Sequence, residues 1–208
     1  HEAIAARGKG LLEHFGDARL ALEGEPFDQA AQALQKQGYG FDFVSDRQLQ
    51  TVQVAGSLLT TGDASYQTVI VPGSSQIPVP TLERLLALAR NGATVIAFHP
   101  LAQDVTGLAD LEPRRAKLRQ LLAEVRLGEA DGDGVREARI GRGGLLQGDK
   151  LEPLLARARV RREAMVDEGL AFTRRRIGDD RVYFVANRGG RPIDGWLPLA
   201  PPAHSVAV

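Results

Sequence analysis

The sequence contains no cysteine, and aromatic residues make up only 5% of its 208 residues. The lack of cysteine excludes disulfides, thiolate catalysis and Cys-ligated zinc. No apolar run approaches the ~20 residues that a membrane-spanning helix needs, so we expect no membrane partner. The 26 basic residues are balanced by 26 acidic ones. Because nucleic-acid-binding domains usually carry a basic excess, we expect no nucleic-acid partner.

The remaining composition is typical of a globular chain, with 43% apolar and 25% charged residues. The most informative stretch is Tyr66–Pro100, where two short apolar runs, Val69–Val71 and Thr94–Phe98, flank an amphipathic segment. This order predicts a strand, a crossover helix and a parallel strand. We expect Thr81 to cap the helix and Asn91-Gly92 to end it. The stretch therefore indicates an α/β fold.

Periodicity and turn residues predict the other elements. Helices are expected over residues 4–15, 26–37 and 113–125, and Asp149 is expected to cap a last helix that runs to residue 156. Phe41–Val44 is expected to be a short strand, and hairpin-like pairs are expected over residues 52–60 and 135–146. Such alternation of strands and helices is typical of one α/β domain, which we place at residues 1–162.

The pattern changes after about residue 162. Strand-like runs at residues 170–177, 182–187 and 193–199 are separated by glycine-rich turns, which favours antiparallel pairing. Three strands rarely bury a core by themselves. Residues 163–208 are therefore interpreted as a small antiparallel β segment that begins a β-sandwich.

Serine and histidine side chains come directly after the two predicted parallel strands. Ser74 and Ser75 lie where a nucleophile elbow would be, but residues 77–80 intervene before the helix, whereas an elbow leads directly into one. His99 and Asp104 could complete a nominal triad with Ser75, although nothing in the spacing requires it. The alternative for the serines is a turn held by hydroxyl-to-backbone bonds. His99 either faces a ligand at the carboxyl edge of the sheet or is hydrogen-bonded in a loop.

Ser45, Asp46, Arg47 and Gln48 form a polar cluster after the predicted strand at Phe41–Val44. The simplest interpretation is an N-cap with a solvated ion pair. We favour a structural role, in which Asp46 or Arg47 holds a loop or an interdomain contact. Direct contact with a sugar is a further option.

Other polar motifs do not form a recognisable site. Asp131–Gly134 resembles part of a calcium loop, but the closing Glu and other ligands are missing, so we predict no metal. Glycoside hydrolysis normally needs two carboxylates ~5 to 10 Å apart, and no acids are spaced in a way that indicates such a pair. The side chains of Arg174–Arg176 should alternate between the two faces of a strand. We therefore predict no catalytic residue in this chain.

Several segments resemble one family in their order along the chain. Phe41–Leu49 (FDFVSDRQL) resembles the D-[YF]-[IV]-S-D-R-Q-L segment of large bacterial α-L-rhamnosidases, a family of glycoside hydrolases. Further similar segments are Tyr66–Pro72, Pro78–Leu85, Gly92–Ile96, Phe172–Arg175 and Val182–Arg188. The resemblance covers most of residues 26–199.

The resemblance implies that the chain is a piece of a longer enzyme. It implies a flavodoxin-like domain, also called class I glutamine-amidotransferase-like, with a mostly parallel sheet and flanking helices. In such enzymes a catalytic (β/α)-barrel precedes this domain and β-sandwiches come after it. The catalytic glutamates are expected on the barrel, and no cofactor is implied. Amidotransferase activity is not implied, because it needs a nucleophilic cysteine. A periplasmic or extracellular location is expected.

The leading hypothesis is a non-catalytic accessory domain of an α-L-rhamnosidase that acts on plant polysaccharide-derived oligosaccharides. Its partner would be the barrel of the same polypeptide, and its contact with carbohydrate would be indirect. The residues expected at the active-site rim or an interdomain contact are Ser45, Asp46, Arg47, Gln48, Ser74, Ser75 and His99. The alternatives are a stand-alone flavodoxin-like binding module, a trimerisation domain of the β-galactosidase type, or an independent hydrolase that uses Ser75 or His99.

Overall fold

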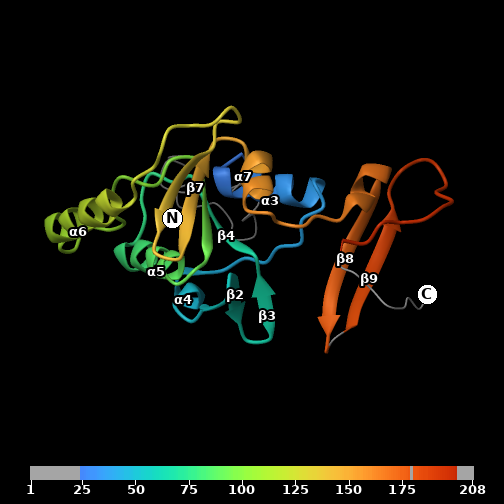
Figure 1. Ribbon diagram of the computed structural model, residues 1–208, viewed down its shortest axis with the longest axis horizontal. Helices are drawn as coiled ribbons and strands as arrows, with labels where there is room; N and C mark the ends of the chain where they lie inside the picture. Colours follow the sequence, from blue (N-terminus) through green and yellow to red (C-terminus); the bar gives the residue numbers. More distant parts are fainter. Residues whose placement is uncertain (1–23, 179, 201–208) are drawn as a thin grey trace, which may run out of the picture. The chain divides into compact units, whose positions relative to one another are not determined.

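The apolar runs form one four-stranded sheet in the order β4-β5-β7-β6 (Figure 1). The strands are β4 (Thr68–Pro72), β5 (Thr94–Phe98), β6 (Arg136–Ile140) and β7 (Gly143–Gly148). β4 and β7 both run parallel to β5, which lies between them, whereas β6 is antiparallel to β7. β5 is strongly apolar because four of its five residues are buried. The expected α/β class is therefore confirmed as a mixed α/β fold.

The computed structural model describes residues 24–178 and 180–200. The chain divides into two compact units. Among the described residues, unit 1 comprises residues 24–30 and 44–160, and unit 2 comprises residues 31–43 and 161–200. The helix expected over residues 4–15 lies outside the described residues.

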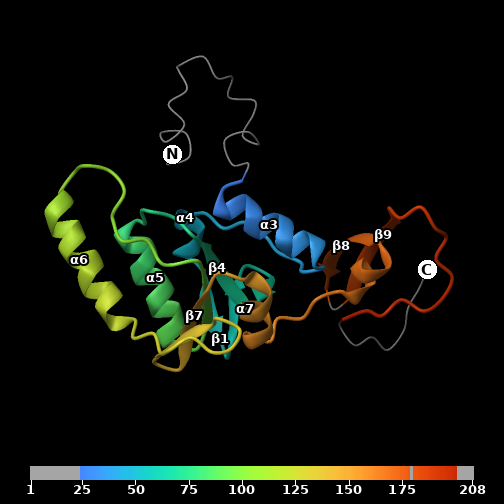
Figure 2. The same cartoon turned by 90° about the horizontal axis from the view of Figure 1, so that it is seen from above.

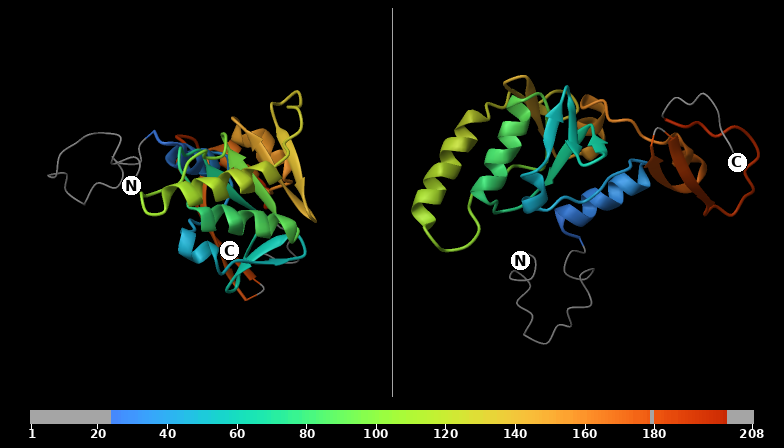
Figure 3. Two further views of the ribbon diagram at one scale, coloured as in Figure 1. Left: turned by 90° about the vertical axis from the view of Figure 1, so that its left-hand side faces the viewer. Right: turned by 90° about the horizontal axis from the view of Figure 1, so that it is seen from below.

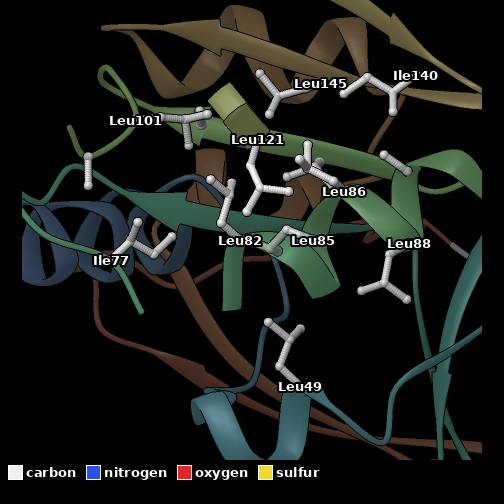
Figure 4. Close-up of a cluster of buried hydrophobic side chains, with 14 of the residues drawn as sticks. Leu49, Ile77, Leu82, Leu85, Leu86, Leu88, Leu101, Leu121, Ile140 and Leu145 are labelled. Carbon is white, nitrogen blue, oxygen red and sulfur yellow. The ribbon is translucent and has the colours of Figure 1, made fainter. Parts of the chain in front are cut away.

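Two helices of unit 1 form successive layers over the sheet, the first on the sheet itself and the second on the first helix. α5 (Val79–Arg90) connects β4 to β5, and its Leu82 and Leu85 are almost completely buried because they recur on one face of the helix. α6 (Leu111–Glu124) packs along α5 and buries Leu118 and Leu121 (Figures 2 and 3). Figure 4 shows side chains of α5, α6 and the sheet gathered in one apolar cluster.

The start of α5 differs from the expectation. Thr81 is not the N-cap, because the helix begins at Val79 and its N-cap is Pro78. Pro80 lies in the first turn, where the missing N–H of proline has no intrahelical partner to lose. The helix therefore starts earlier than the hydroxyl of Thr81 suggests, while its end at Asn91 agrees with the prediction.

A small antiparallel sheet lies between residues 53 and 66 of unit 1, in the order β1-β2-β3. β1 (Gln53–Ala55) and β2 (Leu58–Thr61) confirm the hairpin expected over residues 52–60, and β3 (Ala64–Tyr66) extends it. The strand predicted at Phe41–Val44 was wrong. Three of these four residues are exposed and no ladder pairs them, so their apolar character does not reflect burial in a sheet. The short helix α4 (Asp46–Leu49) comes next.

Unit 2 contains an antiparallel hairpin of β8 (Leu170–Ile177) and β9 (Asp180–Asn187), preceded by the 3₁₀ helix η1 (Ala164–Glu168). The helix α3 (Pro26–Lys36) spans the division between the units and agrees with the helix expected over residues 26–37. The third strand predicted at residues 193–199 was wrong. Pro198 and Gly195, with φ 149°, interrupt that run, and Trp196 is fully exposed. Within the described ranges, no helix is both long and apolar enough to span a membrane.

Candidate functional site

Three parallel strands end at one level and form the carboxyl edge of the sheet. Pro72 of β4 pairs with Phe98 of β5, and Phe98 pairs with Gly148 of β7. The next residues along the chain are Gly73, His99 and Asp149. These three residues therefore emerge side by side where open α/β sheets bind their ligands.

His99 is held in an unusual backbone conformation at this edge. Its φ is 76°, in the left-handed region that non-glycine residues rarely occupy. Its N–H donates to the carbonyl of Gly148 at 2.9 Å, and its ring centroid lies 4.1 Å from that of Phe98. The Nδ1 atom of the ring lies 3.0 Å from Oδ1 of Asp149. These contacts together determine the position of the imidazole.

Gly73 lies directly against His99. A Cβ atom at Gly73 would be only 2.9 Å from the Cβ of His99, which is closer than two such atoms can approach. The absence of a side chain at this position therefore makes room for the histidine. This is a specific packing reason for a glycine that in the sequence marks only a turn.

The partner of His99 corrects the expected role of Asp149 and rules out the possible triad with Asp104. Asp149 does not cap the helix α7 (Leu151–Arg157), because the N-cap of α7 is Lys150 and no side chain caps it. Asp104, which was considered as the acid of a nominal triad, binds Arg115 instead. The sequence does contain a signal for Asp149, because it comes directly after the third parallel strand, just as His99 comes after the second.

Ser74 and Ser75 remain in a turn. Ser74 Oγ donates to the carbonyl of Gln76 at 2.8 Å and accepts from its N–H at 3.3 Å, as expected for a turn held by hydroxyl-to-backbone bonds. Ser75 is exposed, and α5 begins only at Val79. The strand-to-helix geometry of a nucleophile elbow is therefore not formed.

An ion pair ties the loops of this edge together. Asp104 accepts two hydrogen bonds of 2.7 Å from the guanidinium of Arg115 on α6, and its own carbonyl accepts from the N–H of Ile77 at 3.0 Å. The loop after β5 is thereby joined both to the loop after β4 and to α6. The hydrogen bonds from Arg115, and then that from the N–H of Val105, lower the pKa of Asp104 to about 2.

The polar residues of the Ser45–Gln48 cluster mainly stabilise the local structure around α4. Ser45 and Gln48 form a capping box at the start of α4, which confirms the expected N-cap. Asp46 accepts a 2.7 Å hydrogen bond from the hydroxyl of Thr81 on α5. Arg47 is exposed. α4 is thus attached to the first turn of α5, and among the described residues no hydrogen bond or ion pair links this cluster to His99.

The acidic loop at Asp131–Gly134 is held by protein groups. Asp131 Oδ1 accepts from the N–H groups of Asp133 and Val135 at 3.0 and 2.9 Å, and Oδ2 is paired with Arg157. The bond from Val135 is the largest cause of the lowered pKa of Asp131, and the bond from Asp133 adds to it. No group of three or more potential metal ligands occurs in the part of the chain that the structure describes.

Unit 2 contains a buried acid that the sequence did not single out. The side chain of Glu163 is 1% exposed and is paired with Arg174 of β8. It also accepts from the hydroxyl of Tyr183 and the N–H of Ala200, both at 2.8 Å. Burial raises the pKa of Tyr183, and its bond to Glu163 contributes to the shift. All three donors belong to unit 2. Glu163 therefore stabilises this unit by binding three separate parts of its chain.

The fold and its carboxyl edge define a mixed α/β domain with one well-determined histidine–carboxylate pair. Comparison with family models narrows this class. The glycoside hydrolase family 106 model, described as alpha-L-rhamnosidase, matches residues 23–194, and the chain therefore belongs to this family. The resemblance inferred from the sequence is confirmed.

A solved structure agrees with this assignment. The structure of rhamnosidase from Novosphingobium sp. PP1Y is similar to the chain, with a TM-score of 0.55 and 27% sequence identity. The similarity covers 72% of this chain but only 14% of that chain. No curated protein matches the sequence.

Proposed function

We propose that the chain is a non-catalytic accessory domain of an α-L-rhamnosidase that acts on plant polysaccharide-derived oligosaccharides. The observation that carries the proposal is the small share, 14%, of the solved rhamnosidase that the chain matches. The domain would support a catalytic (β/α)-barrel of the same polypeptide. Its sheet order and helix placement favour a flavodoxin-like, or amidotransferase-like, architecture.

The acids of unit 1 support the absence of catalysis. Hydrolysis of a glycoside normally requires one carboxyl group that donates a proton and a second that acts as nucleophile or base. Asp104 is bound by Arg115, Asp131 by Arg157, and Asp149 by His99. Arg115 also pairs with Glu112 and Arg157 with Glu137, so in both clusters a guanidinium lies between the two carboxylates. An arrangement of this kind favours structural ion pairs over a proton donor and a nucleophile.

The turn at His99 also argues against nucleophilic chemistry. A nucleophile on a strained strand end relies on the N–H of the following residue to stabilise the oxyanion. The following residue is Pro100, which has no N–H. A hydrolase with His99 itself as nucleophile would therefore lack that donor. A triad with Ser75 as nucleophile is opposed instead by the engagement of Asp104 with Arg115.

An activity assay tests the proposal. The purified chain should release nitrophenol from an aryl α-L-rhamnoside no faster than buffer does. Turnover that is lost in Ser75→Ala or His99→Asn would overturn the proposal in favour of an independent hydrolase. Light scattering on the same sample should not show a trimer, since a stable trimer would support the trimerisation alternative instead.

The gene supplies a second test. The reading frame upstream of residue 1 should continue into alternating strands and helices of a (β/α)-barrel. A start codon directly before this segment, with no barrel in the frame, would contradict the proposal and favour a stand-alone module.

A further inference from the structure

His99 and Asp149 present unused hydrogen-bonding atoms at the carboxyl edge of the sheet. We propose that this pair binds a carbohydrate, with one hydroxyl donating to Nε2 of His99 and a different, more distant hydroxyl donating to Oδ2 of Asp149. This inference rests on the proposed function, because that function brings the edge of the domain near a glycoside. It assigns a direct ligand contact to residues of the accessory domain.

The backbone of His99 indicates that its position serves more than the fold. A non-glycine residue in the left-handed region costs on the order of 1–2 kcal/mol. β5 has already ended at Phe98, so the sheet itself does not require a histidine in this conformation. Strained residues of this kind persist where their surroundings hold them firmly, and they concentrate at ligand sites. Here the surroundings are Gly73, Phe98, Gly148 and Asp149.

The chemistry of the pair favours a hydroxyl ligand. The carboxylate of Asp149 can only accept, so in the neutral imidazole the Nδ1 that it binds carries the proton and Nε2 is an acceptor. Within residues 24–178 and 180–200, neither Nε2 of His99 nor Oδ2 of Asp149 has a partner. The side chains are 30% and 78% exposed. These two accessible acceptors lie on opposite sides of the Nδ1–Oδ1 hydrogen bond, so each can accept an O–H from a separate hydroxyl of the ligand.

Other ligand classes fit this pair less well. An anion would be repelled by the exposed carboxylate of Asp149. A metal ion would find only one nitrogen and one carboxylate, and the described part of the chain supplies no third ligand nearby. Two hydrogen-bond acceptors without a neighbouring cation are therefore best suited to bind a neutral polyol.

The test monitors the imidazole nitrogens of the full 208-residue chain by ¹H–¹⁵N NMR during titration with methyl α-L-rhamnoside. The spectrum of His99→Asn identifies the signals of His99, and asparagine tolerates the left-handed region. We expect a saturable shift of the Nε2 signal, with a dissociation constant on the order of millimolar. Asp149→Asn should weaken binding about tenfold or more, equivalent to the loss of one charge-assisted hydrogen bond.

Matched variants separate the site from general effects. Asp63→Asn, in the exposed turn between β2 and β3, should bind like the wild type. Gly73→Ala should weaken binding because its Cβ displaces His99, whereas Gly132→Ala, with open space around it, should not. Melting temperatures report that each variant is folded.

Three outcomes would overturn the inference. They are no shift of His99 in the folded wild type up to tens of millimolar rhamnoside, undiminished binding by Asp149→Asn, and an equal response to glycerol. The aryl rhamnoside assay is independent of all three. Turnover by the chain would refute the accessory role, and absence of a shift would refute only the sugar contact.

Discussion

Glu163 illustrates how much a single residue depends on its tertiary partners. Its carboxylate is buried in unit 2 and is bound by the guanidinium of Arg174, the hydroxyl of Tyr183 and the N–H of Ala200. A buried charge is tolerated only when such donors surround it. The sequence predicted that Arg174–Arg176 alternate between faces, and the structure shows why Arg174 points to the buried acid.

Glu163→Gln should destabilise unit 2. The amide loses the charge and offers only one oxygen to three donors, so we expect the free energy of unfolding to fall by about 1–3 kcal/mol. Urea unfolding followed by circular dichroism measures the change. Glu168→Gln, an exposed acid at the end of η1, should stay within about 0.5 kcal/mol of wild type. Equal effects of the two variants would contradict the structural role of Glu163.

At the scale of elements, close backbone approach explains the packing of β7. A Cβ atom at Gly143 would lie 2.1 Å from the carbonyl oxygen of Ala93 and 2.6 Å from that of Ala89. Both neighbours are backbone atoms, which cannot rotate away as a flexible side chain would. The start of β7 can therefore lie this close to the end of α5 only because residue 143 is glycine.

Gly143→Ala should be strongly destabilising. The added methyl group forces β7 away from its neighbours, and we expect a loss of about 3 kcal/mol or more in the free energy of unfolding. Thermal and urea unfolding both report it. Gly132→Ala provides the matched control, because no atom lies within 4 Å of the added Cβ. A loss of stability in Gly132→Ala as large as in Gly143→Ala would refute the packing argument.

The ion pair between Asp104 and Arg115 should make the free energy of unfolding depend on pH. Asp104 has a pKa lowered from 3.8 to about 2 by Arg115 and by the N–H of Val105. A carboxyl group whose pKa is lower in the folded state stabilises the fold above its unfolded pKa. This stability is lost as the pH falls from about 4 through about 2.

Asp104→Asn should therefore lower the melting temperature near neutral pH, and the difference from wild type should shrink as the pH is lowered through this window. Melting curves recorded along a pH series measure the difference. Asp110→Asn, at the N-cap of α6 but without a side-chain capping bond, is the control. A difference that stays constant down to about pH 2 would show that the ion pair contributes nothing.

At the scale of the whole molecule, the core of unit 1 joins helices and sheet through leucine side chains. Leu82, Leu85 and Leu118 are each at most 2% exposed. They belong to α5, which packs on the sheet, and to α6, which packs on α5. Burial of this kind supplies most of the favourable free energy of folding. The stability of the carboxyl edge depends on this core, because β4, β5 and α5 border both.

Leu82→Ala should lower the free energy of unfolding of the chain by about 3–4 kcal/mol, through lost burial and a residual cavity. Denaturant unfolding measures it. Leu108→Ala removes the same atoms from a side chain that is 87% exposed and should change stability by less than about 0.5 kcal/mol. Similar losses in both variants would contradict the assignment of the core.

Local patterns predicted most of the elements. The apolar run at residues 94–98, the amphipathic helix before it and the two strands after residue 170 agree with β5, α5, β8 and β9. The failures were short or interrupted segments. Phe41–Val44 is apolar without being paired, and residues 193–199 contain proline and glycine that prevent a ladder. Periodicity reports burial within one segment, but pairing depends on whether another strand is available.

The sequence by itself determined the α/β class, the parallel unit around β5 and the family, because these depend on local periodicity and on motifs that are contiguous in the chain. Only the tertiary structure decided which acid meets His99. Asp104, five residues away, turns to Arg115, while Asp149, fifty residues away, reaches the imidazole. The physical reason is the register between β5 and β7, which pairs Phe98 with Gly148 and thereby brings the next residues of both strands, His99 and Asp149, together.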